Sequence, residues 1–179
     1  MADAVRVLLE SGGYRAISYQ EVASIAGVGR ATVYRRWPTR AALTFFGISQ
    51  MVTQQIVIAD TGTIERDLPE TLMSLARFLA TPFGRAALTA SLEIEVDSEI
   101  RHALWLERAG EIRRMFDRAY GRGQLPSTAN VDVGLSMAAG SVYFRIAVAA
   151  SHPDAAWIES VAASVLYALR QEPIGLSTA

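Results

Sequence analysis

Cysteine and lysine are both absent from the 179-residue sequence. Because there is no cysteine, a disulfide framework, thiolate metal ligands and a cysteine nucleophile are excluded, and a reducing compartment such as the cytoplasm fits this composition. Histidine is also scarce, since His102 and His152 are the only two. They lie far apart in the sequence, and neither belongs to an HExxH pattern. We therefore expect no metal centre and no cofactor.

Long apolar runs are lacking as well. No segment reaches the roughly 20 consecutive apolar residues that cross a bilayer, and the chain does not begin with the basic and apolar stretches of a signal peptide. The longest candidate, residues 137–150, is interrupted by Ser141 and Arg145. We interpret it as a buried helix, and we expect a cytoplasmic protein that does not enter a membrane.

Paired catalytic side chains are not evident. Glu93 and Glu95 are two residues apart, so that on a helix they project about 200° from each other and cannot converge. The segment Gly121-Arg122-Gly123 ends a predicted helix and does not follow a strand, which excludes a phosphate-binding loop. We expect no enzymatic activity, because a small helical enzyme requires a cluster of titrating groups that this sequence does not contain.

Helical periodicity is what the sequence does contain, with no strand-like alternation longer than a few residues. It predicts an all-α fold of about nine helices. The first helix is expected over residues 2–12, and Tyr14 and Ile17 are expected to fill the adjacent core from the connecting loop. Beyond the next two short helices, the predicted helices cover residues 39–56, 68–81, 83–96, 98–120, 130–151 and 154–171.

Two short helices joined by a tight turn are predicted between the first and fourth helices. Ser18 and Glu21 have the spacing of a capping box, so that a helix begins just after Ser18. Gly27 supplies the positive φ that ends it. The following helix must end by Trp37, because Pro38 disfavours the α conformation at its predecessor.

The two short helices have distinct inner and outer faces. Val33 and Trp37 are four residues apart, and we expect them to bury against Val22 and Ile25. The remaining side chains of the second helix then point outward: Arg30, Thr32, Tyr34, Arg35 and Arg36. This arrangement predicts a helix-turn-helix whose second helix fits a DNA major groove.

Positive charge is concentrated near the N-terminus, although the whole chain carries a net charge of −1. Residues 1–45 contain six arginines and three acidic residues, a balance of +3, so that residues 46–179 must carry −4. A local excess of this kind is typical of a segment that binds DNA phosphates.

Several short motifs at fixed offsets resemble one family. They are Gly13-Tyr14, Ile17-Ser18, Val22-Ala23, Ala26-Gly27-Val28, Thr32-Val33-Tyr34, Trp37-Pro38-Thr39-Arg40 and Ala42-Leu43. Because of these motifs, the N-terminal part of the chain resembles the N-terminal domain of the TetR family of bacterial transcription regulators. The rest of the chain resembles the family in helical layout more than in motifs. At Met1-Ala2-Asp3 the chain departs from the family pattern, because a basic arm before the first helix is absent or was removed.

The resemblance implies a helix-turn-helix DNA-binding domain over residues 1–45 and a helical ligand-binding and dimerisation domain over residues 46–179. Hydroxyl groups and arginines on the second short helix and at neighbouring helix ends would contact phosphates and base edges. The candidate DNA-binding residues are Ser18, Tyr19, Arg30, Thr32, Tyr34, Arg35, Arg36, Thr39 and Arg40. Ser18 and Thr39 also serve as helix caps, and for Ser18 capping alone is an equally good explanation.

A ligand pocket in the helical body is also implied by the resemblance. The sequence supplies large apolar groups and a few polar anchors there, although core packing explains each apolar residue at least as well. The candidate pocket residues are Phe78, Leu92, Glu93, Trp105, Met115, Phe116, Tyr143 and Arg145. Such a lining favours a largely apolar small-molecule inducer.

The last two predicted helices are rich in small residues, which permit close backbone approach. In proteins of the resembled family, these helices meet their symmetry copies in a four-helix bundle, and a twofold dimer matches helix-turn-helix geometry. The candidate interface residues are Met137, Ser141, Phe144, Ile158, Val161, Val165 and Leu169.

These observations predict a ligand-responsive transcription repressor that binds a palindromic operator as a homodimer and is released by a small molecule. Transcriptional activation is an alternative mode of the same protein. A ligand-sequestering or scaffold protein of the same fold, without DNA binding, is the alternative from another class.

Overall fold

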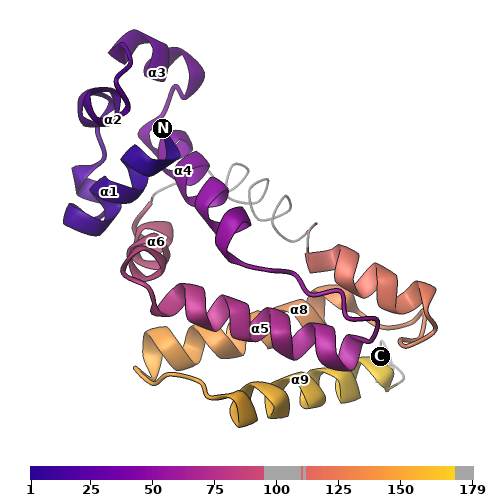
Figure 1. Cartoon of the computed structure of the whole chain (residues 1–179). Helices are drawn as coiled ribbons and strands as arrows, with labels where there is room; N and C mark the ends of the chain where they lie inside the picture. The colour runs from indigo at the N-terminus through magenta and orange to yellow at the C-terminus, as the bar shows by residue number, and fades with distance from the viewer. Residues whose placement is uncertain (95–109, 111, 172–179) are drawn as a thin grey trace, which may run out of the picture. The chain divides into compact units, whose positions relative to one another are not determined.

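The computed structural model of the chain describes residues 1–94, 110 and 112–171, and these residues form helices, turns and loops without any strand (Figure 1). Its eight labelled α-helices and a further helix over residues 112–121 make nine in the described part of the chain. The predicted all-α fold is therefore confirmed. Most of the helix predicted over residues 98–120 lies outside the described residues.

The chain forms two compact units. The first comprises residues 1–56 and the segment that begins at residue 77, and the second comprises residues 57–76 and the chain from residue 109 onward. The first unit is thus longer than the segment 1–45 that the sequence favours as a domain. This difference arises because two further helices pack on the first one.

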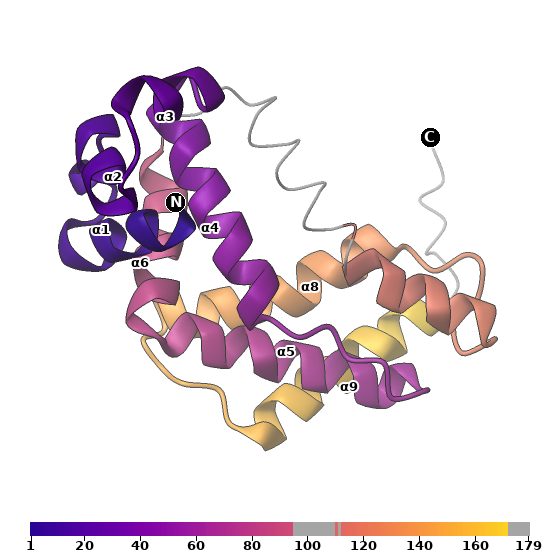
Figure 2. The same ribbon diagram turned by 45° about the horizontal axis from the view of Figure 1, so that its top comes forward.

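Three α-helices and a short 3₁₀-helix begin the first unit (Figures 1 and 2). They are α1 (Ala2–Gly12), η1 (Tyr14–Ala16), α2 (Tyr19–Ala26) and α3 (Arg30–Arg36). The predicted bounds of the first three α-helices are confirmed to within about a residue. α1 packs against α2, and α2 packs against α3.

The turn between α2 and α3 is set by local chemistry. The backbone amide of Glu21 donates to Ser18 Oγ at 3.1 Å, which caps α2 at its start. Gly27 ends α2 in the left-handed conformation, with φ 66° and ψ 34°, and the amide of Val28 donates to the carbonyl of Ala23 at 3.0 Å. Both the predicted cap and the predicted glycine turn are confirmed.

The core between these helices contains Val5, Ile17, Val22 and Val33, each at most 1% exposed. The prediction for Ile25 is wrong, because this side chain is 46% exposed. On α2, Ile25 follows the buried Ala23 by two residues and therefore projects about 200° away from it.

Two further helices complete the first unit by packing on α1. In α4 (Arg40–Gln55), the amide of Ala42 donates to Thr39 Oγ1 at 3.1 Å, which confirms the predicted cap. In α6 (Pro82–Glu93), the amide of Gly84 donates to Thr81 Oγ1 at 2.9 Å. Figure 2 shows α4 running beside α1.

The contact between α1 and α4 depends on Gly47. A Cβ atom at this position would lie 2.5 Å from Cβ and Cγ1 of Val5, which is closer than such atoms can approach. Only glycine therefore allows the two helices to cross at their observed separation.

The helix α5 (Ile64–Ala80) begins four residues before the predicted start at Leu68. The carbonyl of Thr63 accepts hydrogen bonds from the amides of Arg66 and Asp67, at 3.1 and 2.9 Å, and so starts the helix earlier. Pro69 consequently lies inside α5, although the sequence favours it as a first-turn residue. Pro69 lies near the N-terminus of α5, and its missing amide removes only one backbone hydrogen bond of the helix.

The second unit ends in two helices that pack together (Figure 1). α8 (Val131–Tyr143) continues into a π-helical segment, η2 (Phe144–Val148), and α9 (Ala155–Arg170) follows. The single helix predicted over residues 130–151 is therefore α-helical only in its first part. Gly134 allows the close approach that the small residues predict, because a Cβ there would lie 2.8 Å from Cδ1 of Leu169.

Candidate functional site

Most of the exposed side chains of α3 are hydrogen-bond donors. Val33 is fully buried, whereas the other side chains of the helix are exposed, including Tyr34 at 57%. The exposed donors are Arg30, Thr32, Tyr34, Arg35 and Arg36. The structure thus places on one short helix all five residues that the sequence assigns to its outer face.

The arginines of this face keep their positive charge uncompensated. Arg6 on α1 pairs with Glu10 at 3.1 Å. In contrast, no ion pair within the described part of the chain involves Arg30, Arg35 or Arg36. The guanidinium of Arg36 instead lies 5.2 Å from the ring centroid of Trp37. An exposed set of unpaired cations attracts an anionic partner.

Tyr19, a candidate DNA contact, lies partly inside the protein. Its ring packs edge-on against Tyr34, with centroids 5.4 Å apart. Its hydroxyl oxygen is enclosed and has no hydrogen-bond partner among the described residues. Burial raises the pKa of Tyr19 above 10.0, with smaller contributions from Tyr34 and Tyr14. In this conformation Tyr19 supports Tyr34, and its own hydroxyl is not presented to solvent.

Thr39 and Arg40 lie at the N-terminus of α4. The free backbone amides and the positive end of the helix dipole are also at this end of the helix. Both residues are exposed. The guanidinium of Arg40 lies over the ring of Tyr14, with Cζ 4.1 Å from the centroid. This contact was not foreseen from the sequence, which favours Tyr14 as a core residue.

The candidate pocket residues that belong to the first unit differ in exposure. Phe78 is buried and lies edge-on to Phe83, with centroids 6.0 Å apart. Leu92 is 77% exposed, and Glu93 is exposed as well. Trp105 lies outside the described residues.

In the second unit, Met115 and Phe116 are completely buried, and the hydroxyl of Thr71 donates to Sδ of Met115 at 3.5 Å. Tyr143 is 36% exposed at the end of α8. The guanidinium of Arg145 lies 4.6 Å from the ring centroid of Trp157, which joins η2 to α9. The described pocket candidates therefore divide between buried core positions and solvent-facing ones.

A shallow hollow of about 430 Å³ opens on the outer surface of α8, η2 and α9. Its lining consists of Ser136, Met137, Gly140, Ser141, Phe144 and Trp157. Three of these residues, Met137, Ser141 and Phe144, belong to the candidate dimer interface. The hollow and the predicted interface thus share one face.

The other interface candidates do not all reach this face. Ile158, Val165 and Leu169 are at most 5% exposed because they pack inside the unit, so that they are not available to a second copy in this conformation. Val161 is partly exposed. The large apolar side chains that face solvent on α8, η2 and α9 are Val133 at 50%, Met137 at 40%, Tyr143 at 36%, Phe144 at 63%, Val148 at 68% and Tyr167 at 69%.

Residues Val131–Val148 are the one described helical stretch that is long and apolar enough to cross a membrane, with a mean hydropathy of 1.3. Length and composition alone give this result, which the core helix of a soluble protein also satisfies. Part of the stretch is buried against α9, as Ala138 and Val142 illustrate. No group of three or more potential metal ligands occurs in the described part of the chain.

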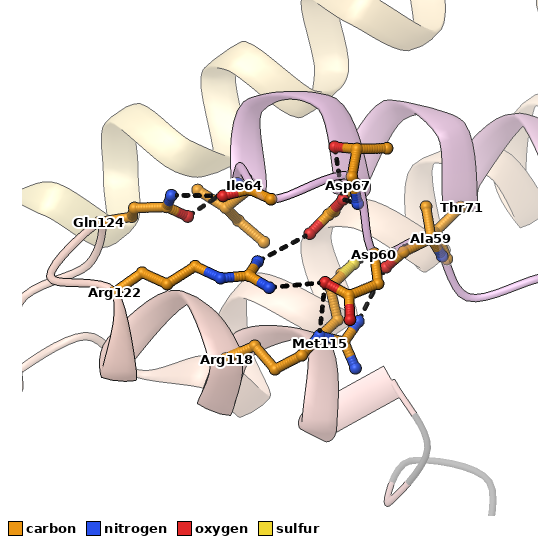
Figure 3. Close-up of polar contacts among 11 residues, drawn as sticks. Ala59, Asp60, Ile64, Asp67, Thr71, Met115, Arg118, Arg122 and Gln124 are labelled. Atoms are coloured by element: carbon orange, nitrogen blue, oxygen red, sulfur yellow. Dashed lines mark hydrogen bonds and ion pairs between the residues drawn. The ribbon is translucent and has the colours of Figure 1, made fainter.

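A polar network that was not predicted from the sequence holds residues 57–63, the connector between α4 and α5 (Figure 3). Arg122 donates to Asp60 Oδ1 at 2.7 Å, and Arg118 Nε lies 3.2 Å from the same atom. Arg118 comes from the helix over residues 112–121, and Arg122 comes from the turn that directly follows this helix. Arg118 also donates to the carbonyl of Ala59 at 2.8 Å.

The backbone of the connector is bound by side chains at further points. The amide of Ala59 donates to Thr71 Oγ1 at 3.1 Å, and Gln124 Nε2 donates to the carbonyl of Gly62 at 2.9 Å. Gln124 Oε1 accepts from the amide of Ile64 at 2.9 Å. The connector therefore has no secondary structure of its own but satisfies much of its backbone hydrogen bonding through neighbouring helices.

A small helical domain with a glycine turn and a basic exposed helix defines a helix-turn-helix protein of the DNA-binding class. Residues 2–45 match the family model described as bacterial regulatory proteins, tetR family. Residues 58–165 match that of the tetracyclin repressor-like C-terminal domain. The chain belongs to the TetR family of bacterial transcription regulators.

Individual relatives agree with this assignment. The chain is 25% identical over 147 residues to the HTH-type transcriptional regulator AqdR of Rhodococcus erythropolis, covering 80% of this chain and 71% of the relative. The structure is similar to that of the TetR family transcription regulator SCO0332, with a TM-score of 0.77, 24% identity and coverage of 93% and 94% of the two chains. It also shares its fold with MexZ, a repressor of Pseudomonas aeruginosa, with a TM-score of 0.56, 21% identity and coverage of 96% and 94%.

The protein is accordingly a DNA-binding transcriptional regulator. Regulators of this family bind operators as dimers, and ligand-responsive repression is their standard role.

Proposed function

We propose that α3 is the helix that reads the operator and that the dimer places one copy of it in each of two successive major grooves. The observation that carries this proposal is the exposed, uncompensated basic face of α3, set by the glycine turn at Gly27. Two such helices would lie about 34–36 Å apart, one turn of DNA.

The proposed contacts divide by chemistry. Arg30 and Arg35 have the planar donor groups that pair with guanine edges, whereas Thr32 and Tyr34 donate single hydrogen bonds to phosphates. Arg36 is a further phosphate contact. The helix N-termini capped by Ser18 and Thr39 add free amides for phosphate binding, and Arg40 adds a cation at the second of them.

The proposed dimer interface is the outward face of α8, η2 and α9. Met137, Ser141 and Phe144 from the predicted set remain in it because they line the hollow on this face, and the exposure of Met137 and Phe144 supports this placement. Trp157 and Tyr167 replace the buried candidates of α9. A large apolar face of this kind marks a protein interaction site when it would otherwise meet water.

We further propose that the protein is a repressor that acts in the cytoplasm and is released by a largely apolar small molecule bound in the helical body. The ligand would favour a dimer whose α3 helices are wrongly spaced, with a coupling free energy of typically about 1–3 kcal/mol. The connector at residues 57–63 leads directly from α4 into the ligand-binding body and supports this route along the chain.

The test begins with selection of bound duplexes from a random-sequence DNA pool at low salt. A palindromic consensus and a mobility shift that weakens steeply with added salt are the expected results, because each phosphate contact releases counterions. Failure to enrich any sequence would contradict operator binding and would favour a ligand-sequestering or scaffold protein of this fold. A compound screen for release of the selected duplex would then identify the inducer.

A further inference from the structure

Tyr14 and Arg40 are in contact although 25 residues separate them in the sequence. Tyr14 begins η1, directly after α1, and Arg40 is the first residue of α4. The Arg40 guanidinium lies over the Tyr14 ring, with Cζ 4.1 Å from the centroid. The ring is partly buried, whereas Arg40 is exposed. The more firmly packed aromatic group thus fixes the position of an exposed cation.

The position of Arg40 is unfavourable for helix stability alone. A cation in the first turn of a helix is repelled by the positive end of the helix dipole. Among the described residues, Arg40 has no carboxylate partner, whereas Arg6 is paired with Glu10. The ring of Tyr14 provides the only described stabilising contact of the Arg40 charge, and an anion at the α4 N-terminus would provide a second.

Stacking leaves the donor groups of Arg40 available. A guanidinium that lies on an aromatic face still presents its N–H groups along its edges, in the plane that matches a phosphate. Fixing this orientation before binding removes part of the side-chain ordering cost that a free arginine meets on association. A similar relationship occurs nearby, where the ring of Tyr19 supports Tyr34 at a centroid distance of 5.4 Å.

We infer that Tyr14 is a positioning residue for DNA binding, which holds the guanidinium of Arg40 in the orientation that meets a backbone phosphate. The inference rests on the proposed function, in which Arg40 contacts the operator. It assigns to Tyr14 a role that core packing alone does not give, because a side chain of similar size without an aromatic face would fill the same space.

The test compares Tyr14→Leu and Tyr14→Phe, each in the wild-type and the Arg40→Ala background, on a duplex selected from a random pool by the wild-type protein. In the wild-type background, Tyr14→Leu should weaken binding about two- to ten-fold, the range expected when one arginine side chain must be ordered on association. Tyr14→Phe keeps the ring face and should restore most of the affinity. In the Arg40→Ala background, neither change should weaken binding further.

The salt dependence separates positioning from loss of the phosphate contact. Arg40→Ala should reduce the slope of log affinity against log salt by about one per protomer, because a counterion is no longer released. Tyr14→Leu should leave the slope unchanged, since the guanidinium still reaches the phosphate but must be ordered on binding. Arg66→Ala, which removes an exposed arginine from α5, is the control for net charge.

Three results would overturn the inference. The first is an operator affinity of Tyr14→Leu equal to that of the wild type, and the second is a loss of affinity for Tyr14→Phe as large as that for Tyr14→Leu. The third is a loss of affinity for Tyr14→Leu that is as large in the Arg40→Ala background as in the wild-type background. This third result would mean that Tyr14 acts through the stability of the fold. If the wild-type protein selects no duplex at all, the proposed function fails and this inference fails with it.

Discussion

Asp67 and Arg122 form an ion pair in which the acidic member is almost completely enclosed. The side chain of Asp67 is 1% exposed and that of Arg122 is 33% exposed, with Oδ2 and Nη1 3.7 Å apart. The other carboxylate oxygen of Asp67 accepts hydrogen bonds from the amide and hydroxyl of Thr61. The hydrogen bonds and the ion pair of Asp67 therefore connect the start of α5 to the connector at residues 57–63 and to the turn that follows the helix over residues 112–121.

Replacing Asp67 with alanine should lower the free energy of unfolding by about 2–4 kcal/mol, because Thr61 and Arg122 both lose a charged partner. Urea denaturation followed by circular dichroism measures this change. Asp117→Ala removes an exposed acidic side chain from the helix over residues 112–121 and should have little effect. A similar loss in both variants would contradict a structural role for the enclosed carboxylate.

Stability should decrease in acid through two exposed carboxylates of the second unit. A hydrogen bond from Arg122 lowers the pKa of Asp60 below 3.8, and one from Arg170 lowers the pKa of Glu65 below 4.5. Because both pKa values are lower in the folded state, the ionised carboxylates stabilise the fold at pH values above the ordinary pKa values. This stabilisation is lost as the pH falls through the lower pKa values of the folded state. The melting temperature should therefore decline below about pH 4.5, and it should decline less steeply in the double variant Asp60→Asn, Glu65→Gln. Parallel acid profiles would argue against this contribution.

Operator affinity should depend on Tyr34 and Arg35 without a matching loss of stability. Tyr34→Phe removes one phosphate donor and should weaken binding about five- to ten-fold, and Arg35→Ala should weaken it more, by about ten-fold or greater. Both side chains are exposed, so the melting temperature and the dimer mass should remain close to those of the wild type. Mobility shifts and thermal unfolding of the same samples provide the comparison. Equal losses of stability and binding would place these residues in the core.

Gly47→Ala should destabilise the first unit, because the new methyl group would lie 2.5 Å from Cβ of the buried Val5. Overpacking of this kind costs about 1–3 kcal/mol. Adding Val5→Ala should recover little of the loss, because alanine lacks Cγ1 and Cγ2 but keeps the Cβ atom at 2.5 Å. Gly121→Ala serves as the control, since a Cβ there would meet no side chain and no backbone from another described segment within 4 Å. A neutral effect of Gly47→Ala on thermal unfolding would mean that α1 and α4 can separate at little cost.

Phe144→Asp should convert the dimer to a monomer, because this side chain is 63% exposed and belongs to the proposed interface. Light scattering during gel filtration measures the mass, and circular dichroism should show an unchanged helix content. Leu92→Asp is the matched control, since Leu92 is 77% exposed on α6, outside that interface. An intact dimer of Phe144→Asp would exclude η2 from the contact.

The sequence was sufficient where one residue type determines local geometry. Ser18, Gly27 and Pro38 act on the backbone within a few residues of themselves, so the two short helices and the turn between them were predicted correctly. The outward face of α3 followed from helical spacing. Ile25 was assigned to the wrong side because the apolar face of α2 is narrow and its direction depends on how α1 packs.

Contacts between distant parts of the chain were beyond the sequence. Met115 and Phe116 were chosen as pocket candidates for their size and apolar character, which do not distinguish a cavity wall from a filled core. Ile158 and Tyr167 lie on different faces of α9, and only the packing of α8 determines which one faces solvent. No pattern in the sequence indicates the contact between Tyr14 and Arg40, because it depends on the path of the chain between them.

The connector at residues 57–63 takes its course from residues that are not its own. Gln124 and Arg118 donate hydrogen bonds to its carbonyl groups, and Thr71 accepts one from an amide of the connector. The conformation of this loop therefore depends on side chains from two other segments of the chain. A chimera that joins the operator-reading half of this regulator to the body of a relative should therefore be fused before residue 57. A junction within residues 57–63 would separate the loop from the side chains that shape it.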